Sequence, residues 1–88
     1  MIENNIERLV TKYISQTKNV FEQIKSTTNS LSSNVEKVKI VIKEAERYFS
    51  DAEYYLAKRR LETSLTSVAY CEGMLDALRI LGFIEFSW

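Results

Sequence analysis

The sequence predicts an all-α protein: a three-helix up-and-down antiparallel bundle with a short apolar C-terminal tail. Apolar residues recur at spacings of three and four along most of the chain, which is the period of a helix with one buried face. The chain has no proline and only two glycines, Gly73 and Gly82, so long helices meet few breakers and tight strand turns lack their usual residues. Its 88 residues suffice for one domain, residues 1–88, with one core.

The first helix is predicted over residues 3–27. Its apolar positions share one stripe, in which Thr17 is a polar exception. They are Ile6, Leu9, Val10, Tyr13, Ile14, Val20, Phe21 and Ile24. Residues 26–34 come next and are rich in Ser, Thr and Asn, whose side chains compete with helical hydrogen bonds. This segment is expected to be the first interhelix loop, with Leu31 packed into the end of the bundle.

The second helix is predicted over residues 34–57. Ser33 and Glu36 have the spacing of a capping box, in which each side chain bonds a free backbone N–H of the first turn. The apolar face of this helix is expected to comprise ten residues, with Lys37, Lys39, Lys43, Glu44 and Arg47 mostly covering the opposite side. The ten are Val35, Val38, Val41, Ile42, Ala45, Tyr48, Phe49, Ala52, Tyr55 and Leu56.

A short turn at Lys58-Arg59-Arg60 is predicted to separate the second helix from the third. No glycine is available there for a left-handed cap, but basic residues suit the negative end of the helix dipole. One unbroken helix through this point is the alternative, and it would be too long for a compact domain of this size.

The third helix is predicted over residues 61–81, with Gly82 as the glycine just past its end. Leu61, Leu65, Val68, Cys71, Leu75 and Leu78 are expected to line its buried face, which Ala69, Met74 and Leu81 would widen.

Composition excludes several classes of function. Twelve acidic and twelve basic residues give zero net charge, so no global attraction to nucleic acid or anionic lipid is expected. The single cysteine rules out an intrachain disulfide and suits a reducing cytoplasm, the expected location. The N-terminal residues lack the apolar core of a secretory signal, and no apolar run reaches the length of a membrane span.

The candidate site on the third helix comprises Tyr70, Glu72, Gly73 and Asp76. Glu72 and Asp76 are four residues apart and share a face, so the pair could bind a metal or exchange protons. One face supplies only two such ligands and the chain has no histidine, so no metal site, cofactor or catalytic residue is expected. Gly73 is expected to serve close helix–helix packing, with approach by a ligand or partner backbone as the alternative.

Two further features have ordinary structural interpretations. The tyrosines of the second and third helices are expected to fill the core with their hydroxyl groups at its edge. They are Tyr48, Tyr54, Tyr55 and Tyr70. Cys71 is expected to act as a small apolar side chain, because a reactive thiol needs an exposed, electropositive setting.

The tail concentrates four large apolar residues within six positions: Phe83, Ile84, Phe86 and Trp88. Exposed, they would form a candidate interface for a partner protein or a second copy. The equally weighted alternative is a tail that folds back over the open end of the bundle.

The C-terminal part of the chain resembles the short archaeal proteins grouped as "domain of unknown function 357". The matching residues are Ala45, Tyr48, Asp51, Ala52, Tyr54, Tyr55, Leu56, Lys58, Leu61, Ala69, Tyr70, Gly73, Leu75, Asp76, Ala77, Leu81 and Gly82. The resemblance implies a small three-helix bundle of unestablished activity, found alone or attached to nucleotidyltransferase-like domains, and it suggests that Tyr70, Gly73 and Asp76 belong together. The family's turn often has a glycine after the lysine, where this chain has Arg59.

Three functions remain as hypotheses. The first is a non-enzymatic module that binds another protein or its own copy, because no nucleophile–base pair, metal cluster or phosphate loop is apparent. The second is a small-molecule or metal-binding accessory domain of a nucleotide-handling enzyme. It would use Tyr70, Glu72 and Asp76 together with Tyr48 or Tyr55. The third is weak nucleic-acid binding by a basic stripe between Lys37 and Arg60, against which the zero net charge argues. No membrane partner is expected.

Overall fold

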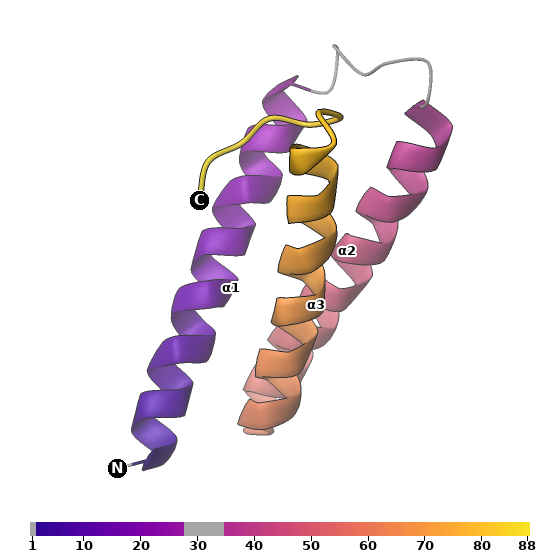
Figure 1. The fold of residues 1–88 in the computed structure, drawn as a ribbon. Helices are drawn as coiled ribbons and strands as arrows, with labels where there is room; N and C mark the ends of the chain where they lie inside the picture. Colours follow the sequence, from indigo (N-terminus) through magenta and orange to yellow (C-terminus); the bar gives the residue numbers. More distant parts are fainter. Residues whose placement is uncertain (1, 28–34) are drawn as a thin grey trace.

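The computed structural model describes residues 2–27 and 35–88 and confirms the predicted all-α bundle. It contains α1 (Ile2–Thr27), α2 (Val35–Ala57) and α3 (Leu61–Ile80), which run up, down and up (Figure 1). The first and last residues of each helix agree with the predicted ones to within one residue. Leu31 and the Ser33 cap lie outside the described residues.

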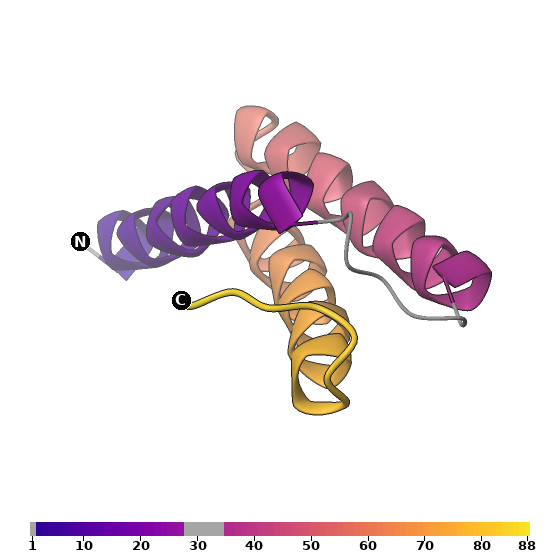
Figure 2. The same ribbon diagram turned by 90° about the horizontal axis from the view of Figure 1, so that it is seen from above.

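α3 is the central helix of the bundle. It packs most extensively against α2 and less against α1, while α1 and α2 touch each other least. The helices are tilted relative to one another, and at the end where the tail lies α1 and α2 diverge (Figures 1 and 2). The tail crosses this end from α3 towards α1. Ile84 of the tail is buried there in one cluster with residues of all three helices.

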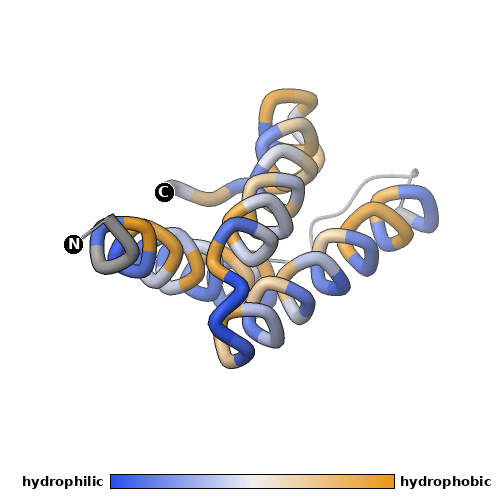
Figure 3. Tube along the Cα trace, turned by 90° about the horizontal axis from the view of Figure 1, so that it is seen from below, coloured by the Kyte–Doolittle hydropathy of each residue, from blue (hydrophilic) through white to orange (hydrophobic). Residues whose placement is uncertain are grey.

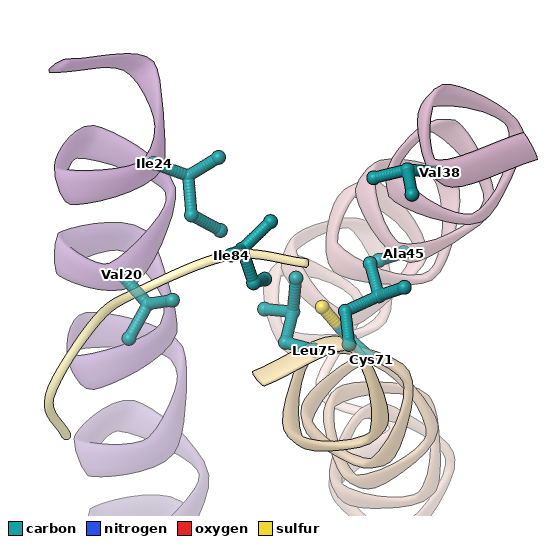
Figure 4. Packing of buried hydrophobic residues seen from close by; sticks show 8 residues of the cluster. Val20, Ile24, Val38, Ala45, Cys71, Leu75 and Ile84 are labelled. Carbon is teal, nitrogen blue, oxygen red and sulfur yellow. The ribbon is translucent and has the colours of Figure 1, made fainter. Parts of the chain in front are cut away.

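The core consists of two apolar clusters stacked along the bundle. The cluster near the basic turn consists of Val10, Ile14, Ala52 and Val68. The cluster near the tail consists of Val20, Ile24, Val38, Ala45, Cys71, Leu75, Leu78 and Ile84 (Figure 4). Burial of these side chains is the main favourable term that holds the helices together.

Two hydroxyl groups lie fully buried beside these clusters, and both are hydrogen bonded. Thr17 Oγ1 donates to the carbonyl oxygen of Tyr13 at 2.7 Å, and Ser64 Oγ donates across the helix pair to the carbonyl oxygen of Ala52 at 2.6 Å. A buried hydroxyl without a partner is costly, so these bonds make the polar positions compatible with the core. The Ser64 bond also fixes the register of α3 on α2.

The predicted break at the basic cluster is a tight turn, visible as a hydrophilic (blue) segment in Figure 3. The N–H of Arg59 donates to the carbonyl of Leu56 at 3.0 Å, and that of Arg60 donates to the carbonyl of Tyr55 at 2.9 Å. This is the Schellman pattern, which requires a left-handed residue just past the helix. Arg59 adopts that conformation, with φ of 62°. A glycine would adopt it there without steric cost, whereas an arginine does not.

The same pattern ends α3. The N–H of Gly82 donates to the carbonyl of Arg79 at 3.0 Å, and the N–H of Phe83 donates to the carbonyl of Leu78 at 2.9 Å. Gly82 is the left-handed residue of this turn, with φ of 85°. The prediction of Gly82 as the glycine past the end of the third helix is therefore confirmed. The turn reverses the chain and directs the tail back over the end of the bundle.

Several sequence-based placements were wrong. Ala69 and Leu81 do not widen the buried face of α3, because both are exposed on its outer side. Tyr54 and Tyr70 are more than half exposed and lie outside the core, whereas Tyr48 and Tyr55 are partly buried. The buried face predicted for the third helix is otherwise confirmed. Five of its six residues are buried and Leu65 is partly buried; the five are Leu61, Val68, Cys71, Leu75 and Leu78.

Candidate functional site

The four candidate site residues of α3 contact different parts of the molecule. Glu72 faces α1, Asp76 faces the tail, Tyr70 stacks on α2, and Gly73 lies on the open side. Glu72 and Asp76 share a face of α3, as their spacing predicts, but each is bonded to a partner from another element.

Glu72 pairs with a residue that the sequence analysis noted only as an exception in the apolar stripe. Its Oε2 lies 3.2 Å from the buried Thr17 Oγ1, which has a 2.7 Å contact with the Tyr13 carbonyl as well. Burial raises the pKa of Glu72; the hydrogen bond from Thr17 acts in the opposite direction, and the charge of Asp76 adds to the rise. The polar Thr17 inside the apolar stripe of the first helix was the sequence signal that could have indicated a polar partner such as Glu72.

Asp76 joins α3 to the tail. Its Oδ1 accepts hydrogen bonds from Arg79 Nε at 3.2 Å and Nη2 at 3.1 Å, and from the Trp88 indole Nε1 at 2.9 Å. The carboxylate is therefore already occupied by a cation and an indole of the same chain. Its role in this structure is to hold the tail.

Cys71 is enclosed in the cluster near the tail and fully buried. Burial, with the nearby charges of Glu72 and Glu46, raises the pKa of its thiol to about 12. A thiol in this setting remains protonated at neutral pH and is a poor nucleophile. Among the described residues, no group of three or more His, Cys, Asp or Glu side chains is arranged to hold a metal ion.

The tail folds back over the end of the bundle, as the second interpretation of its sequence stated. Ile84 is only 6% exposed and lies between Val20 and Ile24 of α1 and Leu75 of α3 (Figure 4). Phe86 and Trp88 pack edge to face, with ring centroids 5.0 Å apart, and the Arg79 guanidinium lies over the Phe86 ring. A partner role for these side chains stays a prediction, since Ile84 is already part of the chain's own core.

Gln23 of α1 holds the tail backbone and was not predicted. Its Nε2 donates to the carbonyl of Ser87 at 2.8 Å, and its Oε1 accepts from the N–H of Ser87 at 3.0 Å. One side-chain amide thereby binds both polar groups of one residue, as a neighbouring β-strand would. A lone glutamine on a helix gives no sequence signal for this contact.

The outer face of α3 presents a shallow apolar groove of about 520 Å³. We use "outer face" for the residues that line it together with the exposed Ile80 and Leu81 beyond its end. The lining residues are Thr66, Ala69, Tyr70, Gly73, Met74 and Ala77. A Cβ atom at Gly73 would meet nothing within 4 Å, so the expectation that Gly73 serves close packing inside the bundle was wrong.

Tyr70, which lines this groove, is stacked on an aromatic ring of α2 that in turn contacts a cation. The rings of Tyr70 and Tyr48 are stacked, with centroids 5.3 Å apart and planes 18° from parallel. The guanidinium of Arg47 lies 4.5 Å from the centroid of Tyr48. A guanidinium and two stacked rings are an arrangement that binds planar groups well.

The comparison with family models decides the family. The model for a protein family of unknown function, DUF357, matches residues 12–84, which include all of α3 and α2 and most of α1. The chain belongs to the DUF357 family. Neither the curated proteins nor the solved structures yield a match to it. In this DUF357 chain, none of the helices within residues 2–27 and 35–88 is both long and apolar enough to cross a membrane.

Proposed function

We propose that this DUF357 chain is a non-enzymatic helical module that docks a helix of a partner protein on the outer face of α3. The carrying observation is the exposure of its large apolar side chains: Tyr70 is 59%, Ile80 73% and Leu81 67% exposed. A helix that is apolar around its circumference is normally buried on all sides. α1, α2 and the tail cover the rest of α3 but leave its outer face exposed, and this face has the apolar composition of an interior surface.

The shape of this face supports a helix as the partner element. Ala69, Gly73 and Ala77 are spaced by four residues and form a row of small side chains along α3. The distance between packed helices depends on the side chains at the contact, so a row of small residues allows a close approach. Gly73 lies at the middle of this row with open space beyond its Cα.

The state of the reactive side chains supports a role without catalysis. Glu72 is engaged with Thr17, Asp76 is engaged with Arg79 and Trp88, and Cys71 is buried. An acid–base or nucleophilic mechanism needs such groups within hydrogen-bond reach of one another and of a substrate.

The test compares two exposed isoleucines. Ile80→Lys places a charge on the outer face of α3, whereas Ile40→Lys places the same charge on α2, where Ile40 is 63% exposed. After partners are identified by mass spectrometry of captured proteins, binding of a purified partner is measured by calorimetry. Binding should weaken at least tenfold with Ile80→Lys and remain unchanged with Ile40→Lys. Equal affinities for both variants would contradict the proposal.

A second candidate function is favoured by the Arg47–Tyr48–Tyr70 stack. The exposed Tyr70 lies beside the groove, where a planar ligand such as a nucleotide base could continue the stack. This would suit an accessory domain of a nucleotide-handling enzyme. A thermal-shift screen with nucleotides tests it: a stabilising nucleotide should lose its effect in Tyr70→Ala and retain it in Tyr54→Ala, which removes an exposed tyrosine elsewhere.

A further inference from the structure

The tail, Phe83–Trp88, lies across α1 and α3 at the end where α1 and α2 diverge (Figures 1 and 4). We use "slot" for the residues of α1 and α3 against which the tail packs or to which it is bonded. They are Val20, Gln23, Ile24, Leu75 and Asp76. The slot has an apolar part, in which Ile84 is buried, and a polar part formed by Gln23 and Asp76. The tail itself forms neither helix nor strand. Apart from the Phe86–Trp88 contact, the interactions described for it are made to the helices rather than within the tail.

The slot has the properties of a peptide-binding groove. Gln23 binds the N–H and the C=O of Ser87, which recognises an extended backbone whatever the side chain. The apolar part accepts a branched side chain three residues earlier, and Asp76 accepts an indole N–H one residue later. Main-chain bonds with pockets for particular side chains are the usual way in which proteins bind extended peptides.

The tail reaches this slot through a single reversing turn. All of its anchoring groups lie beyond Gly82, whose φ of 85° sets the direction of the chain after α3. A glycine adopts left-handed and extended conformations with similar ease, so the turn can open at low cost. Once it is open, residues 83–88 extend away from their own slot and present the same groups to another molecule.

We infer that the slot is a binding site for the tail of a second copy of this chain, so that two copies exchange residues 83–88. The second copy is the occupant because its tail offers every group that the slot binds: the branched side chain, the backbone of Ser87 and the indole. Reciprocal exchange closes into a symmetric pair without leaving a slot empty. This site is separate from the outer face of α3 and does not rest on the function proposed for that face.

Concentration governs which copy fills the slot. A short link holds the chain's own tail at an effective concentration on the order of millimolar, so an intact turn favours the closed monomer at micromolar protein. Any change that disfavours the left-handed turn, but leaves the slot and the tail intact, should favour exchange.

Gly82→Val is such a change, because a β-branched residue rarely adopts positive φ. In sedimentation velocity experiments on the full chain, this variant should form dimers with a dissociation constant at least tenfold below that of the unmodified protein. Trp88, the only tryptophan, should keep the emission of a docked tail. A helical monomer by circular dichroism and sedimentation would overturn the inference.

Gly82→Val combined with Ile84→Asp is the matched control. It retains the open turn but removes the side chain that anchors the tail, so it should be monomeric with red-shifted Trp88 emission. A dimer that survives Ile84→Asp would show association through another surface and would also overturn the inference.

A mixing experiment with the natural turn identifies whose tail is bound. One chain carries Gln23→Ala and Asp76→Ala, which weaken its slot, and the other carries Ile84→Asp and Trp88→Phe, which disable its tail and its fluorescence. Adding the second chain should shift the Trp88 emission of the first to the blue in a saturable manner. Unchanged emission at millimolar concentrations of the second chain would contradict exchange.

Discussion

The turn after α2 and the turn after α3 share one hydrogen-bond pattern but contain different residues at its critical position. Arg59 and Gly82 both have positive φ, 62° and 85°. For an L-residue with a side chain this conformation costs about 1–2 kcal/mol, and for glycine it costs nothing. The two turns also lead into different segments. The first turn leads directly into α3, whereas the second leads into a tail that must be held by its own contacts.

The comparison shows that a helix end can tolerate an unfavourable residue when the next element is large. α3 buries a whole face against α2 and α1. The free energy gained from this burial far exceeds the strain energy at Arg59. The tail buries mainly Ile84 and has less to offset such strain. The glycine therefore lies at the turn that is followed by the less stable segment, the tail.

The largest expected effect is at the anchor of the tail. Ile84→Ala should lower the free energy of unfolding by about 2–3 kcal/mol, the lower part of the range for buried isoleucines, because side chains at an open end can relax. Chemical denaturation monitored by circular dichroism measures it. Ile80→Ala is the control, since Ile80 is 73% exposed and should change stability little. Equal losses in both variants would show that the tail contributes nothing specific.

A smaller loss is expected from placing a side chain at the second turn. Gly82→Ala should destabilise the protein by about 1 kcal/mol, because alanine is strained at positive φ although its Cβ would meet nothing within 4 Å. The same substitution at Gly73, inside α3 and equally open, should raise stability by about 0.5–1 kcal/mol through helix propensity. Thermal unfolding measures both, and effects of the same sign would refute the role of positive φ at Gly82.

The first turn should respond in the opposite direction to the second. Arg59→Gly relieves the strain at φ of 62° and should raise the free energy of unfolding by about 0.5 kcal/mol, since greater chain entropy in the unfolded state offsets part of the gain. Loss of the ion pair between Arg59 Nη1 and Glu7 Oε2, 2.7 Å apart, offsets a further part. Arg59→Ala, which removes the ion pair and keeps the strain, is the control and should not stabilise.

The smallest effect is the pH dependence of the first turn. The hydrogen bond and charge of Arg59 lower the pKa of Glu7 below its usual value of 4.5. A lowered pKa in the folded state means that this contribution is present above the unfolded pKa and is lost as the pH falls through the folded pKa. The stability difference between the unmodified protein and Glu7→Gln should therefore shrink below about pH 4.5. A difference that stays constant down to about pH 3 would contradict this.

Much of the fold was predictable because its signals are local. Helix period marked three helices, and a glycine after an apolar run marked the end of α3 at Gly82. Arginine itself gives no sign of the left-handed conformation that Arg59 adopts. The available signal was the resemblance, because the family's turn often has a glycine at this place. Helical spacing also identified the buried face of α3, but it wrongly added Ala69, Tyr70 and Leu81 to the core, because these residues belong to a second apolar face of the same helix.

The candidate site was predicted poorly for a related reason. Residues close together on one helix were grouped, but their partners come from other elements. Thr17 approaches Glu72 from α1, and Trp88 approaches Asp76 from the tail. Such contacts depend on the relative placement of distant segments, which a single sequence does not encode in its local pattern.

Because Cys71 is buried, the rate at which its thiol reacts can report motions of the bundle. A thiol with a pKa of about 12 and no exposed surface reacts with a disulfide reagent only while the helices around it are transiently apart. The rate at which the reagent labels Cys71 therefore measures how often the tail end of the bundle opens, and no cysteine has to be introduced for the experiment. Because Ile84 lies in the same cluster as Cys71, that rate also reports how often the tail leaves its place.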